Sequence, residues 1–284
     1  MKQNKKYLLA CFIILMFCFY NSFCLADQKD INTSHCITQF KNGTINWTTG
    51  KILATGKASV EDNTQISHNA VPGSARADAN RHIIDILKQL IINNSLSVGK
   101  YASDNDAIMA GIEKTARDAV ITRQYYTSAL SVEILIETSM SGGFLQLVLP
   151  EKIRQIPQIK IEQPQKEMME NSSYTGLIID ARKLGIEPVL NPVIISEQGD
   201  EIYSAAFISR EFAVQNGVCK YYCDLDQASK DDRIGRHPLI IKGLRNAGKQ
   251  NTAIIVSMSD YLILEKITER HTFLKECRVI IVKD

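Results

Sequence analysis

Residues 174–184 read YTGLIIDARKL. Within this stretch three aliphatic residues, LII at 177–179, are followed by a carboxylate, Asp180. An unbroken aliphatic run of this kind is typical of a strand that is buried on both faces. Similar runs recur toward the C-terminus: VII at 193–195, LII at 239–241, AIIV at 253–256 and VIIV at 279–282. Residues 174–284 are therefore predicted to form a mixed α/β domain.

Turn and helix signals between these runs predict how they connect. EQGD at 197–200 predicts a turn, so VIIS and EIYSAAF are expected to pair as a hairpin. SMSD at 257–260 opens a predicted helix that points Tyr261, Leu264 and Ile267 inward. AIIVS, this helix and CRVIIV are expected to form a right-handed β-α-β crossover with parallel strands, which would end a mixed sheet.

The first half of the chain carries the periodicities of a second layer. GKILATGKASV at 50–60 and SALSVEILIE at 128–137 alternate apolar and polar residues, as strands with one buried face do. A helix that Ser74 would cap lies between them. Its residues at helical spacing form a predicted buried stripe: Ala75, Ala79, Ile83, Ile86, Leu87 and Leu90.

Two further elements are predicted in this half. A second helix is expected to open at Ser103, where a capping box reaches Asp106. Gly142-Gly143 is expected to turn the chain into a third strand, FLQLVLP. The order strand-helix-helix-strand-strand predicts a small α+β layer.

The whole chain is therefore predicted to be an α+β protein of two small α/β layers. The N-terminal domain would span 27–149 and the C-terminal domain 174–284. Residues 150–173, PEKIRQIPQIKIEQPQKEMMENSS, combine prolines and charges without a sustained period. This composition predicts a linker between the two domains.

The chain begins with a predicted signal peptide, residues 1–26. Lysines precede an apolar core at 7–20, and cleavage is expected after Ala26. Asn21 and Ser22 interrupt the core before it reaches the length of a membrane span, so the segment would link the protein to a membrane only if it stayed uncleaved. Phe23 before Cys24 departs from a lipobox and disfavours lipidation. We expect a periplasmic or secreted protein.

Charge disfavours nucleic acid as a partner. The chain has 33 lysines and arginines against 31 acidic residues, and cleavage would remove three lysines and no acid, which changes the net charge from +2 to −1. Nucleic-acid binding rests largely on Lys and Arg side chains that neutralise phosphates.

Four cysteines would remain in the processed chain: Cys36, Cys219, Cys223 and Cys277. An oxidising compartment permits disulfides, and four cysteines allow three connectivities. Cys219 and Cys223 are close enough in sequence to bridge, although a helix there would strain the bond. A zinc site needs a second closely spaced Cys or His pair, so no metal and no cofactor are predicted.

GLRNAGKQ at 243–250 has the glycine and lysine spacing of a phosphate-binding loop. Gln250 replaces the hydroxyl residue that such a loop places on magnesium, and the following NTAIIVS is typical of a strand rather than a helix. A hairpin loop with an exposed lysine is the favoured interpretation.

Asp180 is the other candidate for chemistry. The carboxyl end of a strand is where α/β folds often place a site. Arg182 is expected to pair with Asp180 and to lower its pKa, which would make it a poor general acid. The neighbouring sequence supplies neither a histidine nor a nucleophile. The favoured interpretation is that Asp180 caps a turn, so no catalytic residue is predicted.

The segments ILATGKASV, SARADANRHIIDILKQL, SALSVEILIE and GGFLQLVLP resemble the twenty-kilodalton outer-membrane lipoprotein family, which is similar to flagellar basal-disc and assembly proteins. This resemblance covers about residues 45–150. The later stretch, from YTGLIIDARKL to KECRVIIV, resembles the C-terminal half of uncharacterised exported delta-proteobacterial proteins. The resemblance implies an envelope component that works by assembly.

Three functions follow as expectations. The first is a non-enzymatic exported envelope protein that contacts envelope or flagellar proteins and forms homo-oligomers. The second is a periplasmic module that binds a ligand or polysaccharide in a groove between the domains. The third is a hydrolase that uses Asp180 as its acid.

Overall fold

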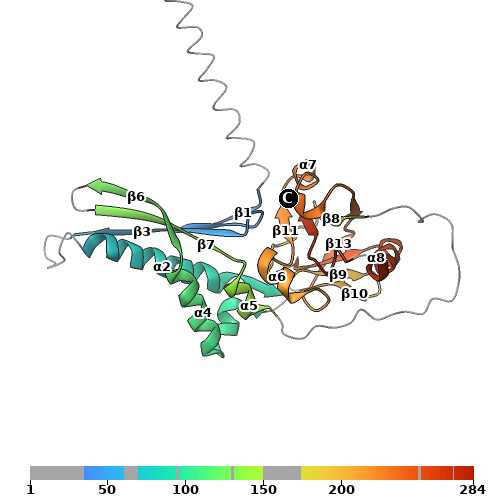
Figure 1. The fold of residues 1–284 in the computed structure, drawn as a ribbon, viewed down its shortest axis with the longest axis horizontal. Helices are drawn as coiled ribbons and strands as arrows, with labels where there is room; N and C mark the ends of the chain where they lie inside the picture. Colours follow the sequence, from blue (N-terminus) through green and yellow to red (C-terminus); the bar gives the residue numbers. More distant parts are fainter. Residues whose placement is uncertain are drawn as a thin grey trace, which may run out of the picture.

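The computed structural model describes residues 35–60, 70–93, 96–128, 131–149, 174–248, 251–270 and 272–284. The predicted signal peptide and the predicted linker lie outside these residues. The fold is α+β, as predicted. An N-terminal antiparallel layer and a C-terminal pair of sheets lie side by side along the longest axis of the molecule (Figure 1).

The N-terminal layer is a five-stranded antiparallel sheet in the order β1-β2-β3-β7-β6. Its strands are β1 (Ile37–Phe40), β2 (Gly43–Asn46), β3 (Lys51–Ser59), β6 (Val120–Ser128) and β7 (Ser131–Ser139). The two strands predicted from alternation are confirmed as β3 and β7. In β7 the alternating Val132, Ile134 and Ile136 are buried.

Helix α2 (Val71–Gln89) packs along β3 and β7, and the predicted stripe from Ala75 to Leu90 is buried. The approach to β3 is close at Gly56, where a side-chain Cβ would lie 2.2 Å from the carbonyl oxygen of Ala75. The helix begins earlier than predicted. Its N-cap is Ala70, without a side-chain cap, so Ser74 lies inside the first turn. Pro72 in that turn is favourable because its missing N–H needs no partner there.

The second predicted helix is confirmed as α4 (Asp106–Arg117), but it begins later than Ser103, and a short helix that was not predicted, α3 (Val98–Ser103), precedes it. Ser103 ends α3, and its hydroxyl donates to the carbonyl of Lys100. Asn105 is the actual N-cap of α4, and its side-chain oxygen accepts from the backbone N–H groups of Ala107 and Ile108. The short strands β4 (Ile91–Asn93) and β5 (Leu96–Ser97) pair just before α3.

The predicted third strand, FLQLVLP, is wrong, because the segment forms helix α5 (Gly143–Val148). Phe144, Leu145 and Val148 are buried, and this spacing is helical rather than alternating. The sheet instead contains three strands that were not predicted: β1, β2 and β6, the last directly before β7. All residues from 120 to 127 are exposed, so β6 lacks the apolar alternation that marks a half-buried strand.

The C-terminal half holds two sheets rather than the single mixed sheet predicted. Parallel strands in the order β11-β15-β8-β12 form one sheet, and the mixed order β10-β9-β14-β13 forms the other. The strands of the first are β8 (Gly176–Asp180), β11 (Lys220–Tyr222), β12 (Pro238–Lys242) and β15 (Val279–Val282). Those of the second are β9 (Val193–Ser196), β10 (Glu201–Tyr203), β13 (Arg245–Ala247) and β14 (Ala253–Val256).

The aliphatic runs and the hairpin at 197–200 are confirmed, since β9 and β10 pair antiparallel around Gly199. The predicted β-α-β crossover is wrong. Helix α8 (Met258–Arg270) does separate β14 from β15, but β14 pairs with β9 and β15 pairs with β8. The two strands therefore belong to different sheets. Sequence order cannot reveal this, because both runs are equally apolar.

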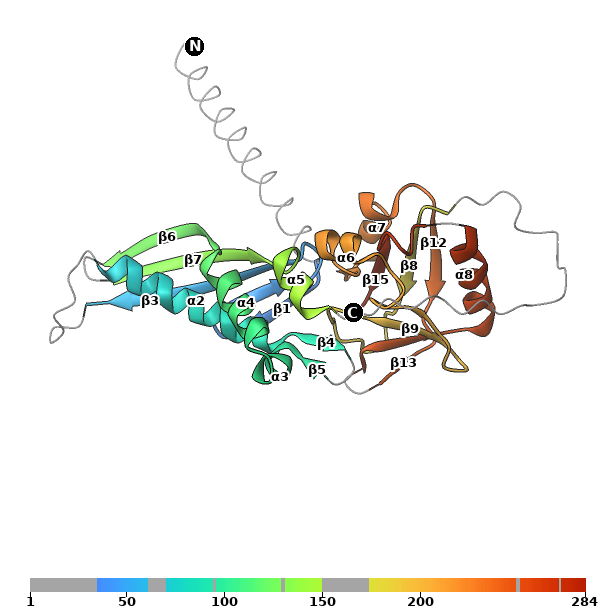
Figure 2. The same cartoon turned by 60° about the horizontal axis from the view of Figure 1, so that its bottom comes forward.

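Backbone hydrogen bonds and a shared core join the two halves. Leu190 and Asn191 donate to the carbonyls of Ile91 and Ile92, each at 2.9 Å. One hydrophobic cluster includes residues of both halves, among them Ile45 and Tyr221. Figure 2 shows β4 and β5 reaching toward β9 and β13 at this junction.

Candidate functional site

A groove of about 590 Å³ opens at the side of the parallel sheet. Helix α6 (Arg210–Asn216), strand β11 and the 3₁₀ turn η2 (Asp232–Ile234) position its walls. Charged residues line it, including Lys220, Lys230, Asp231, Arg233 and Arg278. The short helix α7 (Leu225–Ala228) lies between β11 and η2 in sequence.

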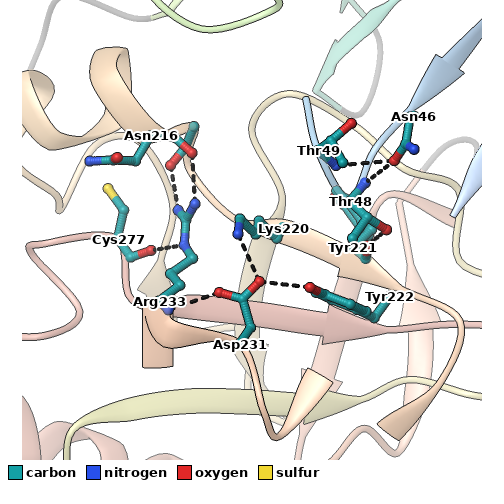
Figure 3. A network of polar contacts seen from close by, with 11 residues as sticks. Asn46, Thr48, Thr49, Asn216, Lys220, Tyr221, Tyr222, Asp231, Arg233 and Cys277 are labelled. Atoms are coloured by element: carbon teal, nitrogen blue, oxygen red, sulfur yellow. Dashed lines mark hydrogen bonds and ion pairs between the residues drawn. The ribbon is translucent and has the colours of Figure 1, made fainter. Parts of the chain in front are cut away.

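Asp231 is the central carboxylate of the groove (Figure 3). Its Oδ2 accepts from Lys220 Nζ and from the Tyr222 hydroxyl, both at 2.7 Å, and its Oδ1 accepts from the backbone N–H of Arg233 at 2.8 Å. Burial acts to raise the pKa of Asp231, but these hydrogen bonds outweigh it and lower the pKa. Burial, followed by the bond to Asp231, raises the pKa of Tyr222. Asp231 is thus held ionised by three hydrogen bonds.

Arg233 binds three backbone carbonyls. Its Nε donates to Cys277 at 2.6 Å, and its two terminal nitrogens donate to Asn216 and Gly217 at 2.6 and 2.5 Å (Figure 3). The side chain therefore fastens η2 to the end of α6 and to the turn before β15. Asp231 and Arg233 thus each make three hydrogen bonds within the fold, which indicates a structural role for both.

A second polar cluster links the halves through Thr48. Its hydroxyl donates to the carbonyl of Tyr221 at 2.6 Å and accepts from the backbone N–H of Cys36 at 3.0 Å. The rings of Trp47 and Tyr221 meet edge to face, with centroids 5.8 Å apart. The crevice beside them has a volume of about 70 Å³, whereas ligand pockets usually measure about 300–1,000 Å³. This crevice is therefore smaller than the usual ligand site.

Asp180 ends β8 and forms the predicted ion pair with Arg182. Its carboxylate accepts from Arg182 Nε at 2.8 Å, from Nη2 at 2.7 Å and from the backbone N–H at 3.2 Å. These bonds, led by the side-chain bond from Arg182, outweigh burial and lower the pKa of Asp180. Asp180 lines neither cavity, and the described residues contain no cluster of three potential metal ligands. It closes a strand and shapes a turn.

The predicted Cys219–Cys223 pair is not joined in this structure. The two residues flank β11, and an extended backbone separates positions four apart by about 13 Å, beyond the reach of a disulfide. Burial raises the pKa of Cys219 to about 12. Cys223 instead faces Cys36, with the two sulfurs 2.7 Å apart.

Strand β6 is the surface that the sequence did not reveal. It is one of the two edge strands of the five-stranded sheet, and among the described residues it pairs only with β7. Val120 is 67% exposed and Tyr126 71%, and Ile121 and Tyr125 are also exposed. Gln124 Nε2 donates to the Tyr126 hydroxyl at 2.8 Å, so neighbours on the strand hold the ring in place. The signal available in the sequence for this strand was its run of β-branched and aromatic residues, VITRQYYT.

Residues 176–284 match a protein-family model described as the second domain of Treponema pallidum Tp0624. The match covers both C-terminal sheets, from β8 to β15, and none of the N-terminal layer. No curated protein matches the chain. The C-terminal half is therefore similar to the second domain of that Treponema protein.

Proposed function

We propose that the protein is a non-enzymatic, exported component of the cell envelope that acts through protein–protein contacts, with β6 as its contact strand. The observation that carries the proposal is the exposure of β6 at the end of its sheet. An edge strand presents unpaired backbone donors and acceptors to any second strand that aligns with it.

Natural edge strands are usually short or carry proline and charges that prevent pairing. The edge strand β12 follows this rule, with Pro238 at its start and Lys242 at its end. Strand β6, VITRQYYTS, is nine residues long, contains no proline and has Arg123 as its only charge. Its composition therefore favours pairing rather than opposing it.

Export and assembly have separate support. The N-terminal segment has the charge and hydrophobic pattern of a signal peptide. Within the described ranges no helix has both the length and the hydrophobicity to cross a bilayer. The resemblance of residues 45–150 to envelope lipoproteins and flagellar assembly proteins favours a partner of that compartment, or a second copy of this chain.

Ligand binding in the charged groove is the second candidate. Its volume of about 590 Å³ lies within the usual range of ligand sites. Such sites are mostly apolar with a few converging polar groups, whereas here Asp231 and Arg233 already bond to the protein. A hydrolase based on Asp180 ranks third, because Arg182 occupies that carboxylate.

Pull-down from envelope fractions tests the contact strand. The wild-type protein and the double variant Tyr125→Lys/Tyr126→Lys serve as separate baits. The charges of the variant oppose strand pairing. Leu244→Lys is the matched control, since Leu244 is 47% exposed and lies outside β6. We expect the double variant to lose the partner and the control to retain it. Retention of the same partner by all three proteins would refute β6 as the contact strand.

A further inference from the structure

Cys36 and Cys223 lie next to each other although 187 positions separate them in the sequence. Their sulfurs are 2.7 Å apart, which is shorter than the van der Waals contact distance of two sulfur atoms. Cys36 directly precedes β1 in the N-terminal layer, and Cys223 directly follows β11 in the parallel sheet. The contact therefore spans the junction between the two halves.

The backbone on both sides of this contact is fixed. His35 and Tyr222 form an isolated antiparallel bridge, so the residues just before the two cysteines are already paired. Trp47 donates to the carbonyl of Cys36 at 2.8 Å, and Lys283 donates to the carbonyl of Tyr222 at 2.9 Å. The contact therefore arises from paired backbone of the fold and not from a loose loop end.

We propose that Cys36 and Cys223 form a disulfide that covalently joins the two halves, while Cys219 and Cys277 remain thiols. A disulfide has a sulfur–sulfur distance of about 2.0 Å, so the bond closes with a shift of less than about 1 Å. Burial raises the pKa of Cys219 and of Cys277 to about 12, which disfavours the reactive thiolate of each.

The oxidant is a disulfide of a small thiol or of an oxidoreductase. Cys223, the less buried of the two, attacks it as a thiolate, which forms a mixed disulfide and releases one reduced thiol. Cys36 then attacks the Cys223 sulfur and displaces the second thiol. The protein loses two electrons and two protons, which leave on the two reduced thiols. Burial raises the pKa of Cys36, which disfavours it as the first attacking thiolate. Its position 2.7 Å from the Cys223 sulfur suits it to the second attack.

The test uses the purified protein, expressed from its full coding sequence and equilibrated with glutathione disulfide. Free thiols are alkylated under native and then denaturing conditions, and the peptides are mapped by mass spectrometry. We expect a cross-linked peptide that contains Cys36 and Cys223, and an intact mass about 2 Da lower than that of the reduced chain. Cys219 and Cys277 should be alkylated only after denaturation.

Variants separate this bond from other pairings. Cys223→Ser should abolish the cross-linked peptide, and Cys219→Ser should leave it unchanged. A cross-link from Cys36 to Cys219 or Cys277 would overturn the proposal, as would alkylation of Cys223 in the native oxidised protein. Mapping of the wild-type protein decides the pairing even if a variant fails to fold. The result is independent of β6, since the pairing requires no partner protein.

Discussion

Replacement of Gly56 by alanine tests the contact between β3 and α2 that shapes the N-terminal layer. A Cβ at this position would lie 2.2 Å from both Ala75 O and Ala79 N, and 2.7 Å from Ala79 Cβ. Non-bonded carbon atoms prefer separations of about 3.5–4.0 Å. The first two obstacles are backbone atoms, so no rotamer change can relieve them, and α2 must move away from the sheet by roughly 1 Å.

Overpacking of a core usually costs about 1–3 kcal/mol, and a clash with helix backbone should reach the upper end of that range. We therefore expect Gly56→Ala to lower the free energy of unfolding by about 3 kcal/mol. For a chain of this size each kcal/mol changes the melting temperature by roughly 2–4 °C, so melting should occur about 6–12 °C lower. Urea titration and circular-dichroism melting measure the two quantities.

Gly73→Ala is the matched control. Gly73 lies in the first turn of α2, and a Cβ there would meet nothing within 4 Å. Alanine at such a position should leave stability unchanged or raise it by up to about 1 kcal/mol. The reasoning is refuted if the free energy of unfolding of Gly56→Ala lies within about 0.5 kcal/mol of the wild-type value. It is also refuted if both variants lose the same free energy of unfolding.

Two further predictions concern the charged groove and the cysteine pair. Asp231→Asn should lower the free energy of unfolding by about 2 kcal/mol at pH 7, because it weakens hydrogen bonds to a charged group. Since the folded-state pKa of Asp231 is lowered, the wild-type advantage is complete above the unfolded pKa and lost as pH falls through the folded value. Urea titrations across pH should show the difference shrinking below about pH 4, and a constant difference would contradict the assigned role. Closure of the 187-residue loop by Cys36 and Cys223 should raise the free energy of unfolding by up to about 5 kcal/mol. That gain should disappear on reduction and in Cys223→Ser, and equal melting curves with and without reductant would count against it.

Local patterns in the sequence predicted the elements that bury one regular face. The stripe of α2 and the alternation of β3 and β7 are confirmed because burial on one side imposes a period on the residues. The same reasoning predicted the hairpin around Gly199, where turn chemistry is local.

The elements that escaped prediction lack such a local signal. Strand β6 is exposed from residue 120 to residue 127, so neither of its faces had to be apolar there. In α5 the run FLQLV is short and mostly apolar, so its sequence alone does not distinguish a strand from a buried helix. The division of the C-terminal strands between two sheets depends on long-range pairing, which equally apolar runs such as β14 and β15 do not encode locally.

The sequence predicted the site residues in part. The Asp180–Arg182 pair was predictable because its partners are two positions apart. Asp231 and Arg233 read as an ordinary charged surface, and their bonds to Tyr222 and Cys277 arise from the tertiary fold. The contact of Cys36 with Cys223 is the extreme case, since no spacing rule connects residues so far apart.

Hydrogen–deuterium exchange of β6 tests the proposed contact strand most directly. An edge strand with unpaired backbone N–H groups exchanges quickly, and pairing with another strand protects it. We predict that peptides covering 120–128 exchange quickly in the isolated protein and several-fold more slowly in the complex recovered from envelope fractions. Unchanged exchange across 120–128, with protection at a different surface, would contradict the account.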